Sequence, residues 1–273
     1  MKKLTEDILY QVIKKRPEQS HKGTYGRVLI IGGTQQFGGA VIMNALAAVN
    51  AGAGLVSVAT DPSNFTALHA HLPEAMVIDF NDDLTDDIQH ADVVLIGSGL
   101  GNRLDIVEAT FDAIMARQIL IVDGSALTLV AENKLSWPQS QLIITPHQME
   151  WQRLSGVTIN EQAFEAFNML AQQRMNVQPI LVLKQHHTQI YTLNQVFEIP
   201  NGGPYQATGG MGDTLAGMIA GFTAQFMLSF PESIMAAVYA HSAIADELSK
   251  NQYVTLPTKI SAALPEFMSR YAK

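Results

Sequence analysis

Short, almost entirely apolar runs recur along this 273-residue chain, and segments of helical length separate them. The runs are rich in Val, Ile and Leu and do not alternate with polar residues, which is typical of strands buried on both faces of a parallel sheet. Seven such strands are predicted, at residues 27–33, 55–60, 75–80, 92–99, 119–124, 142–145 and 180–184. Helical patterns lie between them, for example at 39–50, 104–117 and 160–175. The pattern predicts an α/β fold with a mostly parallel central sheet and helices on both faces.

The pattern changes after Lys184. Residues 188–200 alternate between polar and apolar side chains around Leu193-Asn194-Gln195, which predicts a hairpin or a meander at a sheet edge. Three further helices are predicted at 213–226, 231–248 and 258–271, the last bent at Pro265. No linker, repeat or low-complexity segment interrupts the chain, so residues 1–273 are expected to form a single α/β domain.

The first of these C-terminal helices has two distinct stripes. One is apolar, and the other contains Gly217 and Gly221. Glycine inside a helix costs about 1 kcal/mol relative to alanine. The glycine stripe therefore predicts that another element approaches this helix closely.

Composition limits the possible functions. The chain is 47% hydrophobic and 15% charged, with a formal net charge of −8, so it can form a large core but lacks the basic surplus of a nucleic-acid binder. The absence of cysteine excludes disulfides, thiolate metal sites and cysteine nucleophiles, and it favours the reducing cytoplasm. Two stretches without charge, 28–60 and 214–231, are interrupted by Gly, Asn, Gln, Thr or Ser. We interpret them as buried core rather than membrane spans.

Unusual residues follow the predicted strands one after another. Ligands of open parallel sheets bind beyond the carboxyl ends of the strands, so these segments are expected to form one site. They are Gly32–Ala40, Gly97–Gly101, Asp123–Ala126, Thr145–Gln148 and Lys184–Thr188.

Several of these segments have a purely structural alternative. The first does not match the dinucleotide fingerprint G-x-G-x-x-G, because Gly32 and Gly33 are adjacent. Asp123 fits a helix cap as well as a ligand-binding role. His147 fits either a structural or a functional role, and the Lys184 side chain either extends to solvent or contributes to the site. The neighbouring His186 and His187 lack a partner at metal-ligand spacing and are predicted to lie on the surface.

The segment ATGGMGDTLAG, residues 207–217, combines glycines, one aspartate and the start of a helix. Gly209, Gly210 and Gly212 allow several backbone N–H groups to point one way, and the helix N-terminus adds partial positive charge. The same field is expected to keep Asp213 ionised. A carboxylate beside an anion cradle would repel bound phosphate, but it can accept the proton of a hydroxyl that attacks phosphate. The segment therefore predicts a phosphoryl-transfer site with Asp213 as base, and a capping role for Asp213 is the alternative.

The same segment resembles the G-G-T-G-D-T-L-x-G signature of the ribokinase-like superfamily, and within it the ADP-dependent (S)-NAD(P)H-hydrate dehydratases. Further motifs that resemble this family occur in the family's order over almost the whole chain. They are HKGTYGRVLIIGG (21–33), GGAVIMNALAAVNAGAG (38–54), IGSGLG (96–101), VDGSAL (122–127), ITPHQMEWQRLSG (144–156) and VLKQHHT (182–188).

The resemblance implies a ribokinase-like fold and a repair reaction. In that family, a phosphoryl group moves from ADP to the hydroxyl on the nicotinamide ring of hydrated NADH or NADPH. Elimination of phosphate then restores the ring double bond. The implied ligands are the NAD(P)H hydrate, ADP or ATP as phosphoryl donor, and Mg²⁺, which on charge grounds bridges phosphate oxygens.

The resemblance also implies roles for individual residues. Asp213 matches the catalytic aspartate, and Asp123 is a supporting candidate. The positions implied for nucleotide binding are Lys184, Gln185, His186, His187, Thr188, Gly210 and Gly212. Those implied for the hydrated dinucleotide are Ala40, Gly99, Gly101, His147 and Asp213. No metal ligand is assigned to the protein.

Three positions depart from the family pattern. Gln185 replaces the glycine that usually follows the lysine, and Met211 replaces the threonine of G-G-T-G-D and so removes a hydroxyl donor from the cradle. Ser125 replaces the second aspartate of D-A-D-A-L.

Two other functions remain open from the sequence. One is a ribokinase-like small-molecule kinase acting on a vitamin-precursor alcohol, and the other is a nucleotide-binding regulator that has lost catalysis. The apolar content is also suited to a homo-oligomer, whereas no nucleic-acid or membrane partner is expected.

Overall fold

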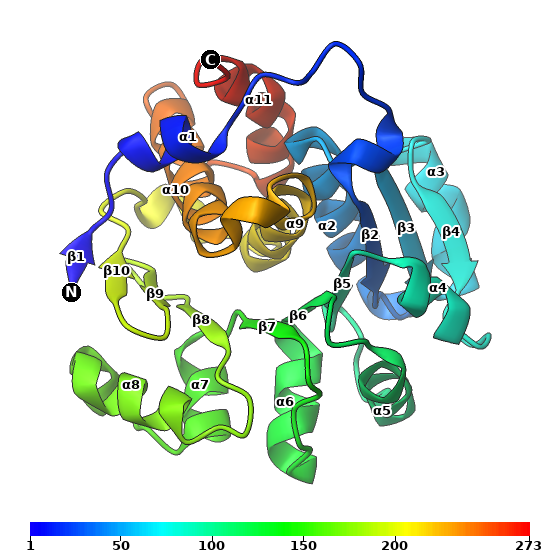
Figure 1. Ribbon diagram of the computed structural model, residues 1–273, viewed down its shortest axis with the longest axis horizontal. Coiled ribbons are helices and arrows are strands. Elements are labelled where there is room, and N and C mark those ends of the chain that lie inside the picture. The colour runs from blue at the N-terminus through cyan, green and yellow to red at the C-terminus, as the bar shows by residue number, and fades with distance from the viewer.

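Seven parallel strands form the centre of the structure, a computed structural model that describes all 273 residues (Figure 1). They confirm the seven predicted strands, and they pair in the order β8-β7-β6-β5-β2-β3-β4. Their bounds are β2 Arg27–Ile31, β3 Leu55–Thr60, β4 Met76–Asp79, β5 Val93–Ile96, β6 Ile119–Val122, β7 Gln141–Ile144 and β8 Ile180–Leu183. The order departs from sequence order at β2, as in an open α/β sheet with crossover helices.

The predicted hairpin lies at one edge of this sheet. It consists of β9 Gln189–Tyr191, which pairs antiparallel with β8, and β10 Val196–Glu198, which pairs antiparallel with β9. One strand was not predicted: β1 Lys2–Lys3 pairs parallel with β10 and completes a ten-stranded sheet. Two lysines carry no periodic pattern, so the sequence gives no signal for this strand.

Helices cover both faces of the sheet, as predicted (Figure 1). On one face lie α1 Asp7–Val12, α2 Gly38–Ala51, α3 Phe65–His71, α9 Met211–Gln225, α10 Phe230–Ser249 and α11 Pro257–Ser269. On the other lie α4 Thr85–His90, α5 Leu104–Ala113, α6 Gly124–Asn133, α7 Gln148–Ser155 and α8 Glu165–Gln173. Short 3₁₀ turns join them: η1 Lys22–Tyr25, η2 Gln35–Phe37, η3 Pro62–Asn64, η4 Glu161–Ala163, η5 Pro204–Gln206 and η6 Met227–Ser229. Ile30 of β2 packs into the core of the first face, whereas Leu29 and Ile31 pack into the second, which explains the uninterrupted apolar strands.

Two predicted helices are shorter than expected. α5 ends at Ala113, because Ile114 is extended and the buried Gln118 side chain accepts a hydrogen bond from the Met115 backbone at 2.8 Å. α8 begins only at Glu165, since the extended Phe164 separates it from the turn η4. In both cases, the apolar periodicity extends beyond the helix itself, after the end of α5 and before the start of α8. The sequence therefore predicts a longer helix than the structure contains.

The glycine stripe of α9 packs against α2, as predicted. A Cβ atom at Gly221 would lie 2.6 Å from the Ala51 Cβ, and one at Gly217 would overlap the Asn44 backbone. The Asn44 side chain also donates a hydrogen bond to the Asp213 carbonyl at 2.6 Å. This contact fixes the start of α9 relative to α2.

The two charge-free stretches belong to the core, as interpreted. Residues 28–60 form β2, α2 and β3, and α9 is buried along most of its length. No single helix has both the length and the hydropathy of a membrane span. Only α9 together with residues Met227–Ser249 reaches both, with a bend of 112° between the two parts.

Candidate active site

All five segments singled out in the sequence follow adjacent strands of the sheet, namely β2, β5, β6, β7 and β8. They therefore gather at one edge, as predicted. The chain is tightly packed here: a Cβ atom at Gly32 would overlap the Ser98 carbonyl, and one at Gly97 would overlap the Asp123 carbonyl. The glycines allow the loops after β2, β5 and β6 to approach one another closely.

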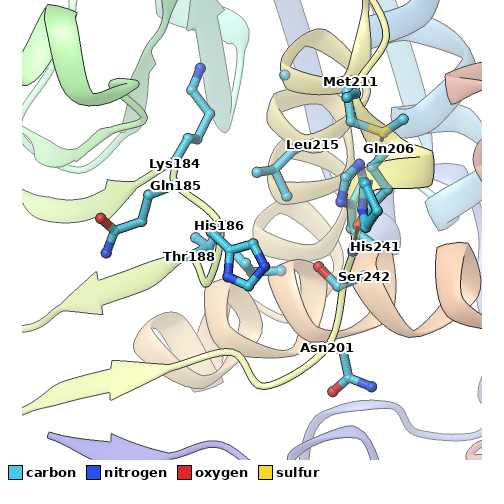
Figure 2. Close-up of a pocket in the computed structure, with 16 residues that line it drawn as sticks. Lys184, Gln185, His186, Thr188, Asn201, Gln206, Met211, Leu215, His241 and Ser242 are labelled. Carbon is cyan, nitrogen blue, oxygen red and sulfur yellow. Dashed lines mark hydrogen bonds between the residues drawn. The ribbon is translucent and has the colours of Figure 1, made fainter.

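A cavity of about 460 Å³ opens between the loop after β8 and helices α9 and α10 (Figure 2). Lys184, Gln185, His186 and Thr188 line one side. The other side is lined by Met211, Gly212 and Leu215 of α9 and by Val238, His241 and Ser242 of α10, and a loop closes the end with Asn201, Gly202, Gly203, Pro204, Gln206 and Ala207. The volume and the mixed apolar and polar lining suit a small organic ligand.

The cavity brings together most of the residues that the sequence proposes for nucleotide binding, but His187 and Gly210 do not line it. His186 is exposed, as predicted. His187 is half-buried: its ring packs edge-on against His186 with centroids 4.2 Å apart, and its Nδ1 is buried without a partner.

Sequence reasoning missed the wall formed by residues 201–207 and by α10. The glycines and proline of NGGPYQ, residues 201–206, precede the glycine-rich segment directly and could have indicated a loop that contributes to the site. Asp246 of α10 organises this loop by accepting hydrogen bonds from the Asn201 side chain at 3.0 Å, the Gly202 N–H at 2.9 Å and the Tyr205 hydroxyl. His241 gave no signal, since it lies in an apolar helix and is only 4% exposed.

Lys184 does not extend to solvent. Its ammonium lies 2.7 Å from Oδ1 of Asp123, and its side chain is 19% exposed. Burial alone would lower the pKa of Lys184, but the nearby Asp123, Glu150 and Asp213 outweigh it and raise that pKa. The cation therefore stays charged at the base of the cavity.

Asp123 is not a helix cap, although it stands at the cap position of α6. It makes no capping hydrogen bond, and its buried carboxylate, 2% exposed, accepts hydrogen bonds from Thr145 at 2.7 Å and Ser98 at 3.3 Å besides the lysine. Polar groups that follow β5, β7 and β8 thus converge on the one carboxylate that follows β6.

The start of α9 has the geometry of an anion cradle. Gly210 stands at the helix N-cap with φ +89°, and the first intrahelical bond runs from the Thr214 N–H to the Gly210 carbonyl at 3.0 Å. The N–H groups of the first turn have no partner within the helix. The Lys184 ammonium lies 3.3 Å from where a Cβ atom of Gly212 would stand. A lysine and free backbone donors therefore share one location, which suits phosphate oxygens.

Asp213 stands in the first turn of α9. Burial and the nearby Asp123 carboxylate raise the pKa of Asp213 to about 6, although Lys184 and the Ser98 hydroxyl lower it. The carboxylate is therefore mostly ionised at neutral pH and close to the range that suits a general base.

The residues implied for the hydrated dinucleotide come from the neighbouring loops. A Cβ atom at Gly99, which has φ +64°, would lie 3.1 Å from the Ala40 Cβ, so these two residues are in close contact. The N–H of Gly101 donates to the Ser125 hydroxyl at 3.2 Å. Ser125, one of the departures from the family pattern, thus ties the loop after β5 to the start of α6.

His147 caps α7. Its Nδ1 accepts hydrogen bonds from the N–H groups of Met149 and Glu150 at 3.1 and 3.2 Å, and the Glu150 carboxylate accepts one from the His147 N–H at 2.8 Å. The side chain remains 52% exposed. Burial and the nearby Lys184 lower the pKa of His147. His147 therefore has the structural role of a helix cap, and its neutral ring also remains exposed at the surface of the site.

The structure contains no group of three or more His, Asp or Glu side chains arranged to hold a metal ion. Mg²⁺ commonly keeps several waters and binds phosphate oxygens. A magnesium ion at this site would therefore be bound mainly through the nucleotide, and we assign it no protein ligand.

Comparison with known proteins identifies the family. A family model described as NAD(P)H-hydrate dehydratase matches residues 28–266. An ADP-dependent (S)-NAD(P)H-hydrate dehydratase of Lactiplantibacillus plantarum is 51% identical over 278 aligned residues, which cover 100% of this chain and 99% of the relative. A ribokinase-like superfamily protein of Enterococcus faecalis V583 superposes with a TM-score of 0.96 at 47% identity, covering 100% of this chain and 96% of the other. The ADP/ATP-dependent NAD(P)H-hydrate dehydratase of Bacillus subtilis, co-crystallised with ATP and Mg²⁺, gives a TM-score of 0.87 at 29% identity, with coverage of 99% and 98%. The chain therefore belongs to the NAD(P)H-hydrate dehydratase family and has its ribokinase-like fold.

Proposed function

We propose that this protein is an ADP-dependent dehydratase that converts the S epimer of NAD(P)H hydrate to NAD(P)H, a hydro-lyase of nicotinamide-nucleotide repair. Five curated relatives of similar length carry this activity in their names at 47–51% identity. The observation that carries the proposal is the position of Asp213, a half-buried carboxylate in the first turn of α9 beside the Lys184 ammonium and next to the cavity.

The adenine nucleotide is proposed to occupy the cavity, with its phosphates at the start of α9. Gly210, Gly212 and Lys184 would hold the phosphate oxygens, because backbone N–H groups and an ammonium meet there. The remaining binding positions are Gln185, His186, His187 and Thr188. Of these, all but His187 line the cavity.

The hydrated dinucleotide is proposed to lie over the loops after β2, β5 and β7, in contact with Ala40, Gly99, Gly101 and His147. The contact between Ala40 and Gly99 supports a shared surface there. The ring hydroxyl must reach both Asp213 and the terminal phosphate of the nucleotide.

The chemistry then follows from the groups at the start of α9. Asp213 accepts the proton of the ring hydroxyl, whose oxygen attacks the terminal phosphoryl group of ADP and displaces AMP. Lys184 and the helix N-terminus stabilise the negative charge that develops on the phosphoryl oxygens. Elimination of phosphate, with loss of a ring proton, restores the double bond. The products are AMP, phosphate and NAD(P)H, so the ring has lost one molecule of water.

We place the protein in the cytoplasm, and the absence of cysteine supports a reducing compartment. Homo-oligomerisation is part of the same proposal. It is supported by exposed apolar side chains on and beside α8, including Phe164, Phe167 and Leu170.

An absorbance assay tests the function. Purified protein is mixed with hydrated NADH and Mg²⁺, with ADP in one sample, ATP in a second and no nucleotide in a third. Nucleotide-dependent return of the dihydronicotinamide absorbance is expected, and the comparison identifies the preferred donor. No return despite nucleotide binding would contradict the proposal and favour a small-molecule kinase or a catalytically silent regulator.

A further inference from the structure

Ser242 of α10 carries a hydroxyl that its own helix does not use. The Ser233 and Ser249 hydroxyls of the same helix each donate to the backbone carbonyl three residues before them, at 2.8 Å. Ser242 makes no such bond, although the residue is only 8% exposed. Its oxygen instead points toward the side of the cavity that His186 lines (Figure 2). A hydroxyl directed into a cavity in this way can bond to a ligand there.

Two further polar atoms lie on the cavity wall formed by α10 and residues 201–207, and neither has a partner within the protein. Nε2 of His241, a residue that is 4% exposed, and Oδ1 of Asn201 are both buried without a hydrogen bond. A Cβ atom at Gly202 would lie 3.5 Å from the Ser242 oxygen, so these groups gather where α10 meets the loop. Buried polar groups are normally hydrogen-bonded, so this gathering indicates a polar ligand.

This wall is electrically neutral. Lys184 is the only lysine, arginine or acidic residue that lines the cavity, and Figure 2 shows its ammonium far from Asn201, at the other end of the view. Burial lowers the pKa of His241 to about 4, so its ring is uncharged at neutral pH. Phosphate oxygens are therefore best bound at the Lys184 end. Neutral donors and acceptors suit the uncharged part of a nucleotide, its ribose and base.

We propose that Ser242 is a binding residue for the phosphoryl donor: with the phosphates at Lys184 and the start of α9, the nucleoside extends toward α10 and is hydrogen-bonded by the Ser242 hydroxyl. This inference rests on the nucleotide site proposed above. It assigns the preference for a nucleotide over inorganic pyrophosphate to a helix that lies outside every motif of the family resemblance. His241 and Asn201 supply further polar groups to the same part of the ligand.

ADP binding by Ser242→Ala tests the contact. Alanine favours the helix, so the variant keeps α10 intact. Titration calorimetry without the hydrated dinucleotide should show a Kd for ADP about fivefold above that of wild type, since one hydrogen bond lost from a complex is worth about that factor.

The matched control is Ser233→Ala, which removes a hydroxyl from the same helix at a position that does not line the cavity. It should leave the Kd for ADP unchanged. Equal Kd values for the Ser242 and Ser233 variants would overturn the inference.

Inorganic pyrophosphate separates a nucleoside contact from a general disturbance of the site. Because it lacks the nucleoside, its affinity, measured in competition with ADP, should be the same in Ser242→Ala and in wild type. A loss as large as the loss for ADP would place the effect at the phosphates and overturn the inference.

Kinetics separates this inference from the proposed function. In the dehydratase assay, Ser242→Ala should raise the KM for ADP about fivefold with little change in kcat, because Ser242 lies away from Lys184 (Figure 2). Weaker ADP binding in this variant supports the inference even if the dehydratase assay fails. Unchanged ADP binding overturns it even if the enzyme is fully active.

Discussion

The Lys184 ammonium lies 2.7 Å from Oδ1 of Asp123, although the two residues end strands β8 and β6 and the strand β7 separates them in the sheet. This buried ion pair stands beside the first turn of α9. It places a positive charge next to the proposed base Asp213 and fixes the position of that charge.

Lys184→Met should destabilise the protein, because it leaves the buried Asp123 carboxylate without its cation. Breaking a buried ion pair in this way costs about 3–5 kcal/mol. Chemical denaturation measures the change in the free energy of unfolding, with the exposed Lys250→Met as matched control. Adding Asp123→Asn to Lys184→Met should restore part of the loss. Equal stability of the Lys184 and Lys250 variants would show that the pair contributes nothing.

Asp213→Asn should abolish turnover, with a loss of at least about 100-fold, while ADP still binds.

The same variant should be more stable than wild type at pH 7. Because burial raises the pKa of Asp213 to about 6, its folded state favours the protonated form: the stabilisation is fully present below the unfolded pKa and is lost as pH rises through about 6. The neutral amide avoids that loss, worth about 3 kcal/mol at most for a pKa raised from 3.8 to about 6.

Kinetics, calorimetric ADP binding and thermal unfolding measure these three effects, with the exposed Asp112→Asn as control. Turnover that survives in Asp213→Asn would refute the assignment of the base.

The pH dependence of kcat/KM should show an acid limb with a midpoint near pH 6. Asp213 must be ionised to accept a proton, and its pKa is raised to about 6 by burial and by Asp123. Activity should therefore fall about tenfold per pH unit below that value. A profile that stays flat down to pH 4.5 would mean that the carboxylate has an ordinary pKa or is not the base.

Gly217→Ala should destabilise the protein by about 1–3 kcal/mol, because the added methyl group overlaps the Asn44 backbone of α2. Gly39→Ala is the matched control, since a Cβ atom there meets nothing within 4 Å. The difference between their unfolding free energies measures how closely α9 approaches α2. Equal stability of the two variants would contradict the packing described above.

Much of the fold follows from the sequence, for a physical reason. Strands such as β5 are buried on both faces, so their apolar runs are continuous and stand out from the helices around them. The location of the site was also predictable, because parallel strands end at one edge. The glycine stripe of α9 predicted that another element approaches this helix closely, and the structure identifies that element as α2.

Other features depend on distances that a sequence does not contain. The ion pair of Asp123 with Lys184 depends on the order of β6, β7 and β8 in the sheet, so the sequence pattern offered only a cap and a ligand-binding role. The pKa of Asp213 depends on how deeply α9 packs and on the Asp123 carboxylate nearby. His241 reads as part of an ordinary core helix until the fold places it beside the cavity.

The most direct test of the central claim is the stoichiometry of the reaction. The protein is incubated with the S epimer of NADH hydrate, ADP and Mg²⁺, and the amounts of NADH, AMP and phosphate are measured together. The account predicts that the three appear in equal amounts and that the R epimer yields none of them. AMP formed together with a stable phosphorylated product, without NADH or free phosphate, would contradict the dehydratase and identify a kinase.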